Sequence, residues 1–317
     1  MNFTLNVLGT ASAKPSANRN SSAQVLDVRG RLFLIDCGEG TQRQFCRQHL
    51  SFERIDAIFI SHIHGDHLFG LFGLLSTIGL ATGRKGIRIF GPNSLGPVLK
   101  FFLSYFGEQL GINIDFTPVK AKSPEVIFEN KFLTVEAFPL NHRIETYGYL
   151  FREKMPQLNV RKDAIEEYGL GVAEICSLKK GEDLVRTDAV GCPMLRIPNG
   201  ELTFLPYRPR AFAYCSDTAP FPELSEWVKD VDLLYHETTY MAGLEKEAAA
   251  RYHSTTLQAA RCALEACAGK LIAGHYSSRY RDTAPLLAEL RSVFPNSFTA
   301  NDGDVFDIPL CKHEDSR

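Results

Sequence analysis

The chain has 317 residues, of which 44% are hydrophobic and 11% aromatic, and its formal net charge at pH 7 is -2. A chain of this length and composition can bury a substantial core, so we expect a globular protein. With this near-balanced charge the protein has no net positive charge that would attract nucleic acid. A nucleic-acid partner would therefore need a local basic patch.

The cysteine pattern and the N-terminus bear on the compartment. The eight cysteines form no CxxC pair, which in a chain this long is typical of reduced thiols and favours a cytoplasmic protein. The stretch from Met1 to Val7 alternates like a strand and lacks the layout of a signal peptide, and no apolar run is long enough to span a bilayer. We therefore expect no membrane partner.

The first predicted elements are a strand and a polar loop. Phe3 to Leu8 has the alternation of a strand, and Thr10 to Asn20 follows as a loop. The end of this loop, Pro15 to Asn20, carries one cation and several amides, which suit contacts to phosphates or base edges. A mobile surface loop explains the same composition equally well.

A hairpin and a tight turn come next. Residues 24–28 and 32–35 read as paired strands, and the turn DCGEGT at residues 36–41 leads into a helix predicted from Gln42 to His49. Asp36 in this turn could accept a hydrogen bond from a metal-bound histidine. The residues alone slightly favour a plain helix cap for this carboxylate.

The stretch SHIHGDH at residues 61–67 is the strongest chemical signal in the chain. It follows a short apolar strand, residues 57–60, and His62 and His64 lie two apart on extended backbone, so both point the same way. Asp66 and His67 come after the turn at Gly65 and can face a second centre. Three imidazoles and a carboxylate suit zinc, manganese or iron, and two ions fit better than one. The alternative is a solvated, histidine-rich turn.

Helix and strand patterns alternate after this motif. An apolar helix is predicted from Leu68 to Leu80 and another helical stretch from Leu95 to Phe106, which indicates an α/β layered fold. Three consecutive strands, residues 126–128, 133–138 and 147–151, then indicate that the sheet is mixed. His142 lies between the last two of them.

Residues 152–210 differ in composition from their surroundings and read as an insertion. Charges of both signs are mixed there with several prolines. The cluster LKKGE at residues 178–182 forms a basic tip that could contact a phosphate backbone, although on charge alone a solvated protrusion is the better interpretation.

The layered pattern resumes in the last third of the chain. Three short apolar strands, residues 211–215, 233–235 and 271–273, each end in polar groups. These groups are Ser216-Asp217-Thr218, His236-Glu237-Thr238 and His275. A helix is predicted from Thr256 to Ala268, with Ser254 or Thr255 as its N-cap.

These motifs together resemble a known family. The series His62-x-His64-x-Asp66-His67 followed by His142, Asp217 and His275 is similar to the dinuclear zinc hydrolases of the metallo-β-lactamase fold. Within them the chain most closely resembles the ribonuclease Z family, which removes 3′ trailers from precursor tRNA. Further marks are DCGEGT at 36–41, SDT at 216–218, HETT at 236–239, HST at 253–255 and HYSSRY at 275–280. The resemblance implies an αββα sandwich of two mixed sheets flanked by helices, one domain over 1–317, with a flexible tRNA-binding arm inserted at 152–210.

The resemblance also implies roles for the site residues. It places His62, His64 and His142 on one zinc ion and Asp66, His67 and His275 on another, with Asp217 bridging the two, and manganese or iron as alternatives. Asp66 would be the general base for the attacking water. His253, oriented by Glu237, would protonate the departing oxygen of the tRNA, although His253 before a helix could also simply cap or pack.

Substrate contacts and assembly follow from the same resemblance. The residues expected to contact precursor tRNA are Arg19, Asn20, Lys179, Lys180, Ser277 and Arg279. The protein is expected to be a homodimer in which the arm of one subunit holds the tRNA cleaved in the other. The loop departs from the family form PxKxRN, because Ala17 stands at the lysine position, which bears on how a 3′ CCA is treated. The stretch GLGVAE at residues 169–174 replaces a Gly-Pro-rich stretch of the arm.

Two other functions remain open from the residues. One is a small-molecule hydrolase of the same fold, acting on a phosphodiester or a sulfate ester. The other is a non-catalytic RNA-binding or scaffold protein. His49 and His313 match no motif and are expected to be ordinary surface residues, and Cys215 is expected to pack in the core.

Overall fold

Two mixed β-sheets face each other in the computed structural model, which describes residues 1–83 and 85–312. The first sheet has the order β18-β1-β2-β3-β4-β5-β6, and the second has the order β17-β16-β15-β14-β9-β8-β7. The strands of the first sheet are β1 (Phe3–Gly9), β2 (Ala23–Val28), β3 (Arg31–Ile35), β4 (Ile55–Phe59), β5 (Gly86–Pro92), β6 (Asn113–Val119) and β18 (Val305–Asp307). Those of the second are β7 (Glu125–Glu129), β8 (Leu133–Pro139), β9 (Tyr147–Glu153), β14 (Ala211–Cys215), β15 (Leu233–Glu237), β16 (Leu271–Gly274) and β17 (Ser297–Thr299).

Each sheet combines the two pairing modes, as the sequence predicts. In the first sheet β3, β4, β5 and β6 run parallel, while β18, β1, β2 and β3 pair antiparallel. In the second, β14 to β17 run parallel, and β14 pairs antiparallel with β9. The parallel strands of each sheet carry their connecting helices on its outer face.

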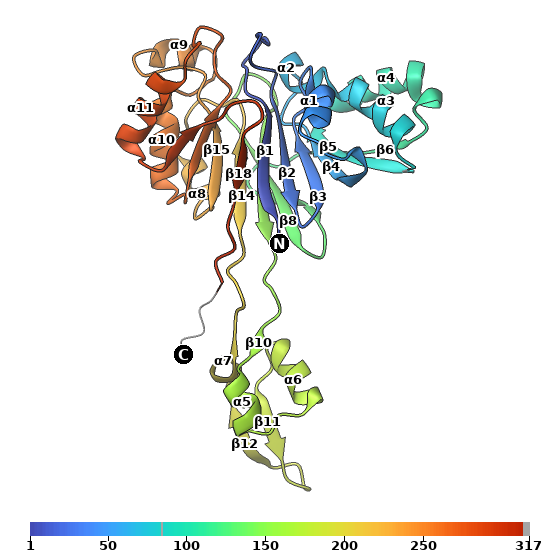
Figure 1. The fold of residues 1–317 in the computed structure, drawn as a ribbon, viewed down its shortest axis with the longest axis vertical. Helices are drawn as coiled ribbons and strands as arrows, with labels where there is room; N and C mark the ends of the chain where they lie inside the picture. The colour runs from blue at the N-terminus through green and yellow to red at the C-terminus, as the bar shows by residue number, and fades with distance from the viewer. Residues whose placement is uncertain (84, 313–317) are drawn as a thin grey trace. The chain divides into compact units, whose positions relative to one another are not determined.

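Helices cover the outer faces of both sheets (Figure 1). On one side lie α1 (Thr41–Arg47), the short turn η1 (Phe52–Arg54), α2 (Gly65–Leu68), α3 (Leu71–Ala81) and α4 (Leu95–Leu110). On the other lie α8 (Glu223–Trp227), α9 (Glu245–Ala250), α10 (Thr256–Glu265) and α11 (Ala284–Val293). The order of layers is therefore helix, sheet, sheet, helix.

The principal core lies between the sheets and is rich in aromatic rings. Phe33 and Phe59 of the first sheet meet Phe128 and Phe151 of the second. The Phe59 and Phe151 ring centroids lie 5.3 Å apart at an interplanar angle of 82°, an edge-to-face arrangement that aromatic quadrupoles favour. Two further apolar clusters lie under the helices on either side. A rigid core of this kind fixes the strand ends from which the site residues project.

Contacts divide the chain into two compact units. We call residues 1–152 with 210–308 the body, and residues 153–209 with the described part of the segment from Pro309 the arm. The arm has its own apolar cluster, which includes Val160, Leu178, Leu184 and Leu202. Its elements are β10 (Asn159–Val160), α5 (Lys162–Glu167), α6 (Val172–Lys179), β11 (Leu184–Thr187), β12 (Pro193–Ile197), α7 (Asn199–Leu202) and β13 (Thr203–Phe204).

The four predicted helices all have different limits in the structure. The helix expected from Gln42 to His49 is α1, which ends at Arg47, and the one expected from Leu95 to Phe106 is α4, which continues to Leu110. The helix expected from Leu68 to Leu80 is α3, which begins only at Leu71 and ends at Ala81, while Leu68 is the last residue of the short helix α2. Between the two helices the Gly70 N–H bonds to the Cys37 carbonyl at 2.9 Å. A Cβ at Gly70 would lie 2.1 Å from the Gly38 carbonyl oxygen, so only glycine fits this close approach. The helix expected to reach Ala268 ends at Glu265, and Thr255 is its N-cap, accepting a bond from the Gln258 N–H at 3.4 Å.

Three minor expectations concern single residues. Cys215 is fully buried in the core and His49 is exposed, as expected. His313 lies outside the described residues. Within the described ranges, no helix combines the length and the apolar character that crossing a bilayer would require.

Candidate metal centre and active site

The motif residues gather where strands of both sheets end. His62 to His67 follow β4 of the first sheet, while His142, Asp217 and His275 follow β8, β14 and β16 of the second. Because the strands hold these segments at fixed spacing, residues more than two hundred positions apart become neighbours. A cleft of about 540 Å³ opens beside them, lined among others by His64, Asp66, His142, Asp217 and His253.

The first cluster consists of His62, His64, His142 and Asp217. The distance from His62 Nε2 to His64 Nδ1 is 3.0 Å, and that from His142 Nε2 to His64 Nδ1 is 3.4 Å. Asp217 Oδ2 lies 3.7 Å from His62 Nε2 and 3.9 Å from His142 Nε2. Three ring nitrogens and one carboxylate oxygen therefore converge on one point, as a tetrahedral ion requires.

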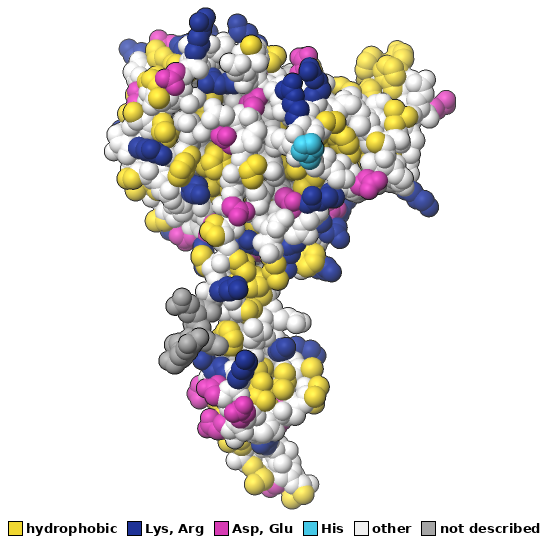
Figure 2. Space-filling model, in the orientation of Figure 1, with side chains coloured by type: hydrophobic (Ala, Val, Ile, Leu, Met, Phe, Trp, Pro, Cys, Tyr) yellow, Lys and Arg dark blue, Asp and Glu magenta, His cyan; other side chains and the backbone are white. Residues whose placement is uncertain are grey.

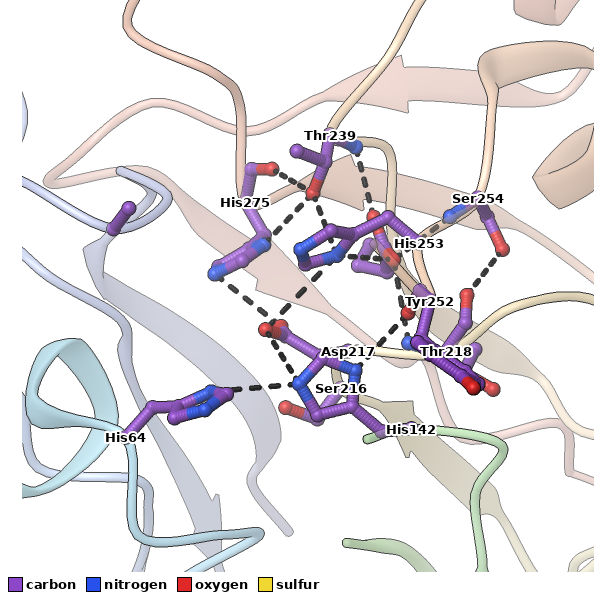
Figure 3. Close-up of polar contacts among 12 residues, drawn as sticks. His64, His142, Ser216, Asp217, Thr218, Thr239, Tyr252, His253, Ser254 and His275 are labelled. Carbon is purple, nitrogen blue, oxygen red and sulfur yellow. Dashed lines mark hydrogen bonds and ion pairs between the residues drawn. The ribbon is translucent and has the colours of Figure 1, made fainter. Parts of the chain in front are cut away.

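The second cluster consists of Asp66, His67 and His275. His67 Nε2 and His275 Nε2 are 3.1 Å apart, and Asp66 Oδ2 lies 3.6 Å from the former and 3.4 Å from the latter. Asp217 Oδ1 faces the same two nitrogens at 3.5 Å and 3.3 Å. Each oxygen of Asp217 thus faces a different cluster, and Figure 3 shows this carboxylate among the rings of His142, His253 and His275.

The remaining ring nitrogens of the histidines are held by hydrogen bonds that fix their tautomers. His142 Nδ1 donates to the Tyr252 carbonyl at 3.1 Å (Figure 3). His275 Nδ1 lies 3.0 Å from Thr239 Oγ1, which itself donates to the His275 carbonyl and therefore accepts from the ring. In both rings the proton sits on Nδ1, which leaves the Nε2 lone pair directed at the cluster.

Asp36 holds His67 of the second cluster through the ring nitrogen that faces away from the cluster. This fully buried carboxylate accepts from His67 Nδ1 at 2.7 Å and from Tyr214 Oη at 2.7 Å. It also accepts from the backbone N–H of Ser61 at 2.7 Å and from Ser61 Oγ at 2.9 Å. Ser61 Oγ in turn lies 2.9 Å from His62 Nδ1. Of the two interpretations of Asp36, the orientation of a ligand histidine is therefore the one that its contacts support, and α1 has Gly40 as its N-cap.

The charges of the two clusters shift the pKa values of their members. Burial lowers the pKa of His62, and the neighbouring histidines lower it further. Burial opposes protonation of His67 as well, but Asp217, Asp66 and Asp36 outweigh it and raise the pKa of this ring to about 10. The pKa of Asp66 would be raised by burial, yet His67, His275 and the Ala13 N–H hold it well below its usual range. Such shifts are typical of functional sites.

His253 and Glu237 form a separate pair at the edge of the cleft. His253 Nδ1 lies 2.9 Å from Glu237 Oε1, and Glu237 is fully buried. Glu237 also accepts from the backbone N–H groups of Thr239 and Ser254, both at 2.8 Å. Burial would lower the pKa of His253, but Glu237 overcomes it and raises this pKa to about 9. The ring is therefore protonated at neutral pH and can donate a proton.

His253 also lies near the second cluster, because Asp217, His253 and His275 offer donor atoms within 4.8 Å of one another. Its Nδ1 is 4.0 Å from Asp217 Oδ2. The shorter contact of the same nitrogen to Glu237 shows that this nitrogen is already engaged. The geometry therefore separates His253 from the metal-facing histidines.

The residues expected to contact substrate lie in three places. Ser277 and Arg279 line a second cavity of about 430 Å³ that also includes His253, and Arg279 Nε donates to Ser277 Oγ at 3.2 Å. Arg19 donates to the Tyr280 carbonyl at 2.7 Å, and Asn20 Nδ2 donates to Asp302 Oδ2 at 2.8 Å. Lys179 and Lys180 are exposed in the arm.

Several groups of the site escaped sequence reasoning. The Tyr252 carbonyl and the Ala13 N–H, which donates to Asp66 Oδ2 at 2.6 Å, are backbone groups that have no residue signature. Tyr214 looks like any aromatic residue of a buried strand, and its hydroxyl contact to Asp36 depends on the pairing of the two sheets. Thr239 lies in the HETT motif, and that motif was the one signal that could have identified it.

Comparisons with known proteins agree with this geometry. A family model described as anti-Pycsar protein Apyc1 matches residues 3–155. A relative named ribonuclease Z from Bacteroides fragilis (strain YCH46) is 40% identical over 300 residues, covering 95% of this chain and 97% of the relative.

Two solved structures are similar in fold. The short form of human tRNase Z is 26% identical with a TM-score of 0.70, covering 96% of this chain and 99% of that one. The metallo-β-lactamase fold protein YhfI from Bacillus subtilis is 18% identical with a TM-score of 0.67, covering 96% of this chain and 99% of that one, which shows the fold alone. The fold is therefore the metallo-β-lactamase sandwich, and, on the identity and coverage of its relative, the chain belongs to the ribonuclease Z family.

Proposed function

We propose that this chain is a metal-dependent endoribonuclease that removes the 3′ trailer from precursor tRNA. The observation that carries the proposal is the pair of donor clusters joined by Asp217, found in a member of the ribonuclease Z family. A tRNA substrate and eight free cysteines support a cytoplasmic protein.

Two zinc ions are the cofactor that the donor set fits best, with manganese and iron as the alternatives. His62, His64 and His142 would hold one ion, Asp66, His67 and His275 the other, and Asp217 would bridge them. Asp217 Oδ1 supports this assignment, because it is a buried oxygen without a hydrogen-bond partner among the described residues. A buried carboxylate oxygen is costly to leave unpaired, and a cation would satisfy it. Bound there, the ions would supply Lewis acidity, which lowers the pKa of water and neutralises phosphate charge.

Asp66 is the general base of the proposed reaction. Its carboxylate lines the cleft, and its Oδ2 lies 3.6 Å from His67 Nε2 and 3.4 Å from His275 Nε2, next to the second cluster. It accepts a proton from the attacking water, whose oxygen forms the new bond to phosphorus.

His253 is the general acid. Because its Nδ1 proton is held by Glu237, its Nε2 proton is the one available to the departing 3′ oxygen. The bond between phosphorus and the 3′ oxygen breaks, the proton from His253 completes the 3′-hydroxyl of the tRNA, and the 5′-phosphate remains on the trailer. Glu237 stabilises the charged ring and fixes its orientation.

Substrate phosphates are held around this centre. Arg279 packs over the Tyr240 ring with its guanidinium 5.0 Å from the centroid, and its Nε donates to Ser277 Oγ. These contacts restrict the side chain and leave the terminal guanidinium N–H groups for phosphate oxygens. Ser277 beside it offers a hydroxyl. Arg19 and Asn20 lie in the loop from Thr10 to Asn20, and Lys179 and Lys180, at the C-terminal end of α6, give the arm two exposed cations for the tRNA backbone.

A homodimer completes the proposal, in which the arm of one subunit holds the tRNA cleaved in the other. An exposed apolar surface on α3 and α4, formed by Leu80, Phe101, Tyr105 and Phe106, supports it. Figure 2 shows hydrophobic side chains gathered in this region. Contiguous exposed aromatic groups of this kind mark protein interfaces.

The dimer is tested by its mass in solution at micromolar concentration. We expect a dimer for the wild type and a monomer for the double variant Phe101→Glu with Tyr105→Glu. The matched control is Leu264→Glu, a charge placed on an exposed leucine of α10, which should stay dimeric. A wild-type monomer with full activity would refute the assembly.

The function is tested with a 3′-extended precursor tRNA, with and without CCA. Zinc-loaded protein should release a trailer with a 5′-phosphate, and chelation should abolish the release. The position of the cut would show how the loop that carries Ala17 treats CCA. If protein shown to contain two metal ions leaves the RNA intact, the function is wrong and a small-molecule phosphodiester becomes the candidate substrate.

A further inference from the structure

The loop from Thr10 to Asn20, between β1 and β2, is tied to both sides of the cleft. The Ser12 N–H donates to the Tyr276 carbonyl at 3.0 Å, next to the ligand candidate His275 of the second sheet. The Ala13 N–H donates to Asp66 Oδ2 at 2.6 Å, next to the first sheet. Ala13 also lines the cleft itself. The loop therefore connects the two halves of the site along one wall of the cleft.

Ala13 adopts a backbone conformation that an alanine rarely takes. Its φ is 62°, in the left-handed region, where an L side chain crowds its own backbone. Such strain persists only where surrounding contacts hold it, and it is concentrated at functional positions. Here the conformation directs the N–H at the one oxygen of Asp66 that also faces His67 and His275.

Asp302, from the turn before β18, supplies the contacts that hold the loop. Its Oδ1 accepts from Thr10 Oγ1 at 2.8 Å. Its Oδ2 accepts from the Asn20 N–H at 2.6 Å and from Asn20 Nδ2 at 2.8 Å. One carboxylate thus binds the first and the last residue of the loop and fixes its span.

We propose that Ala13 and Asp302 are positioning residues for the general base. Asp302 holds the ends of the loop, the loop holds Ala13 in its left-handed conformation, and the Ala13 N–H holds the Asp66 carboxylate in the orientation that proton transfer needs. The proposal rests on the role of Asp66 in the proposed function. Its consequence is that RNA in contact with the loop acts on the base, so that binding in the cleft and chemistry are coupled through this segment.

The contact is tested first in metal-free protein, independently of catalysis. In protein labelled with ¹⁵N-alanine, the Ala13 amide proton should resonate far downfield and exchange slowly with solvent, because a short bond to a carboxylate has this effect. Asp66→Asn should move the resonance upfield, and Asp302→Ala should speed the exchange. Asp304→Ala is the matched control, since the Asp304 carboxylate bonds to Asn301 within the same turn, and it should change neither.

The role in the reaction is tested by removing the N–H alone. Lactic acid in place of Ala13 makes the preceding amide an ester, which keeps the methyl group and removes the donor. We expect kcat to fall about 10- to 100-fold, the size of a missing hydrogen bond to a charged group. KM and bound metal should be unchanged. Ala13→Gly keeps the donor and allows positive φ, so its kcat should fall much less than that of the ester variant.

Two results would overturn the proposal. One is an ester variant with wild-type kcat, and the other is an ester variant that loses its metal, because the contact would then support the ligands and not the base. If the wild type fails to cleave precursor tRNA, the proposed function fails, and the amide measurements still decide whether the loop holds Asp66.

Discussion

Replacing Asp36 by Asn tests whether the carboxylate behind the metal-facing histidines determines metal affinity. Asn is nearly isosteric with Asp, and it tolerates the positive φ of 58° at this position, so the turn should keep its backbone. The change removes the negative charge and converts one acceptor oxygen into a donor amide. The perturbation is therefore confined to the hydrogen bonds of a single side chain.

The structure sets the magnitude. Oδ2 accepts three bonds, from His67, Tyr214 and Ser61 Oγ, and Oδ1 accepts the Ser61 N–H. The Asn oxygen will take the position with three donors, so the new amide faces the Ser61 N–H. One buried donor then lacks an acceptor, which lowers the free energy of unfolding by about 1–3 kcal/mol. Because His67 and, through Ser61, His62 lose their charged support, zinc affinity should fall about 10- to 100-fold.

Zinc affinity would be measured by competition with a chromophoric chelator, and stability by urea unfolding of the metal-free protein. Asp56→Asn is the matched control, since Asp56 is also a buried carboxylate of the first sheet but pairs with Arg31 and Arg88, away from the site. It should lower stability and leave zinc affinity unchanged. An Asp36→Asn protein that binds zinc as tightly as the wild type would refute the reasoning.

Three further predictions concern the acid, the arm and pH. His253→Ala should slow cleavage about 10²- to 10⁴-fold but slow it far less with a substrate whose leaving 3′ oxygen is sulfur, and equal losses would exclude His253 as the acid. Lys179→Ala with Lys180→Ala should weaken binding of precursor tRNA and make it less dependent on salt. The slope of the logarithm of the binding constant against the logarithm of the salt concentration should become shallower by about 0.9 for each phosphate that these lysines neutralise. An unchanged slope would contradict the proposed role of the arm. Arg186 lowers the pKa of Glu174 to about 2. The ionised carboxylate of Glu174 therefore stabilises the arm at pH values above the ordinary pKa of a glutamate, and this stabilisation is lost as the pH falls through about 2. At pH 7 the arm of Glu174→Gln should therefore unfold at a lower urea concentration than the arm of the wild type, and near pH 2 the two should unfold at the same concentration. Equal urea midpoints at pH 7 would contradict the stabilising role of ionised Glu174.

The parts of the fold that depend on short-range pattern could be predicted from the sequence. The alternation and apolar runs of the strands predict a mixed sheet, and the family resemblance supplies the second sheet. Gly65, where the sequence predicts a change of direction, is the first residue of α2, which carries Asp66 and His67. Where the limits were wrong, the cause is a contact between distant segments. The helix predicted from Leu68 begins only at Leu71, because Gly70 packs against Gly38, and no local pattern encodes that approach.

The candidate site divides in the same way. Side chains of unusual chemistry, such as the histidines of the SHIHGDH motif, identify themselves through spacing and family resemblance, and the structure brings them together in two clusters. The roles of Asp36 and Ala13 are set by what folds against them. From its sequence context Asp36 is slightly more consistent with a helix cap than with a histidine partner, and Ala13 contributes only a backbone N–H.

The site lies where strands of both sheets end, which explains why the residues that orient its ligand candidates are far apart in sequence. Ligand candidates come from both sheets, so their relative position depends on how the sheets pack. Each histidine must also be held in one tautomer, so that the ring nitrogen facing the cluster carries a lone pair and not a proton. The histidine Nδ1–H groups donate hydrogen bonds to Tyr252, Thr239 and Asp36, and these acceptors supply this control. Asp36 and Thr239 lie just after the core strands β3 and β15, so the rigidity of the core is transmitted to the rings that they hold, whereas Tyr252 lies in the turn after α9. A shift of about one ångström between the sheets would move one oxygen of Asp217 away from the cluster that it faces. The close-packed aromatic core between the sheets prevents such a shift, so the metal centre depends on this core as well as on its ligands.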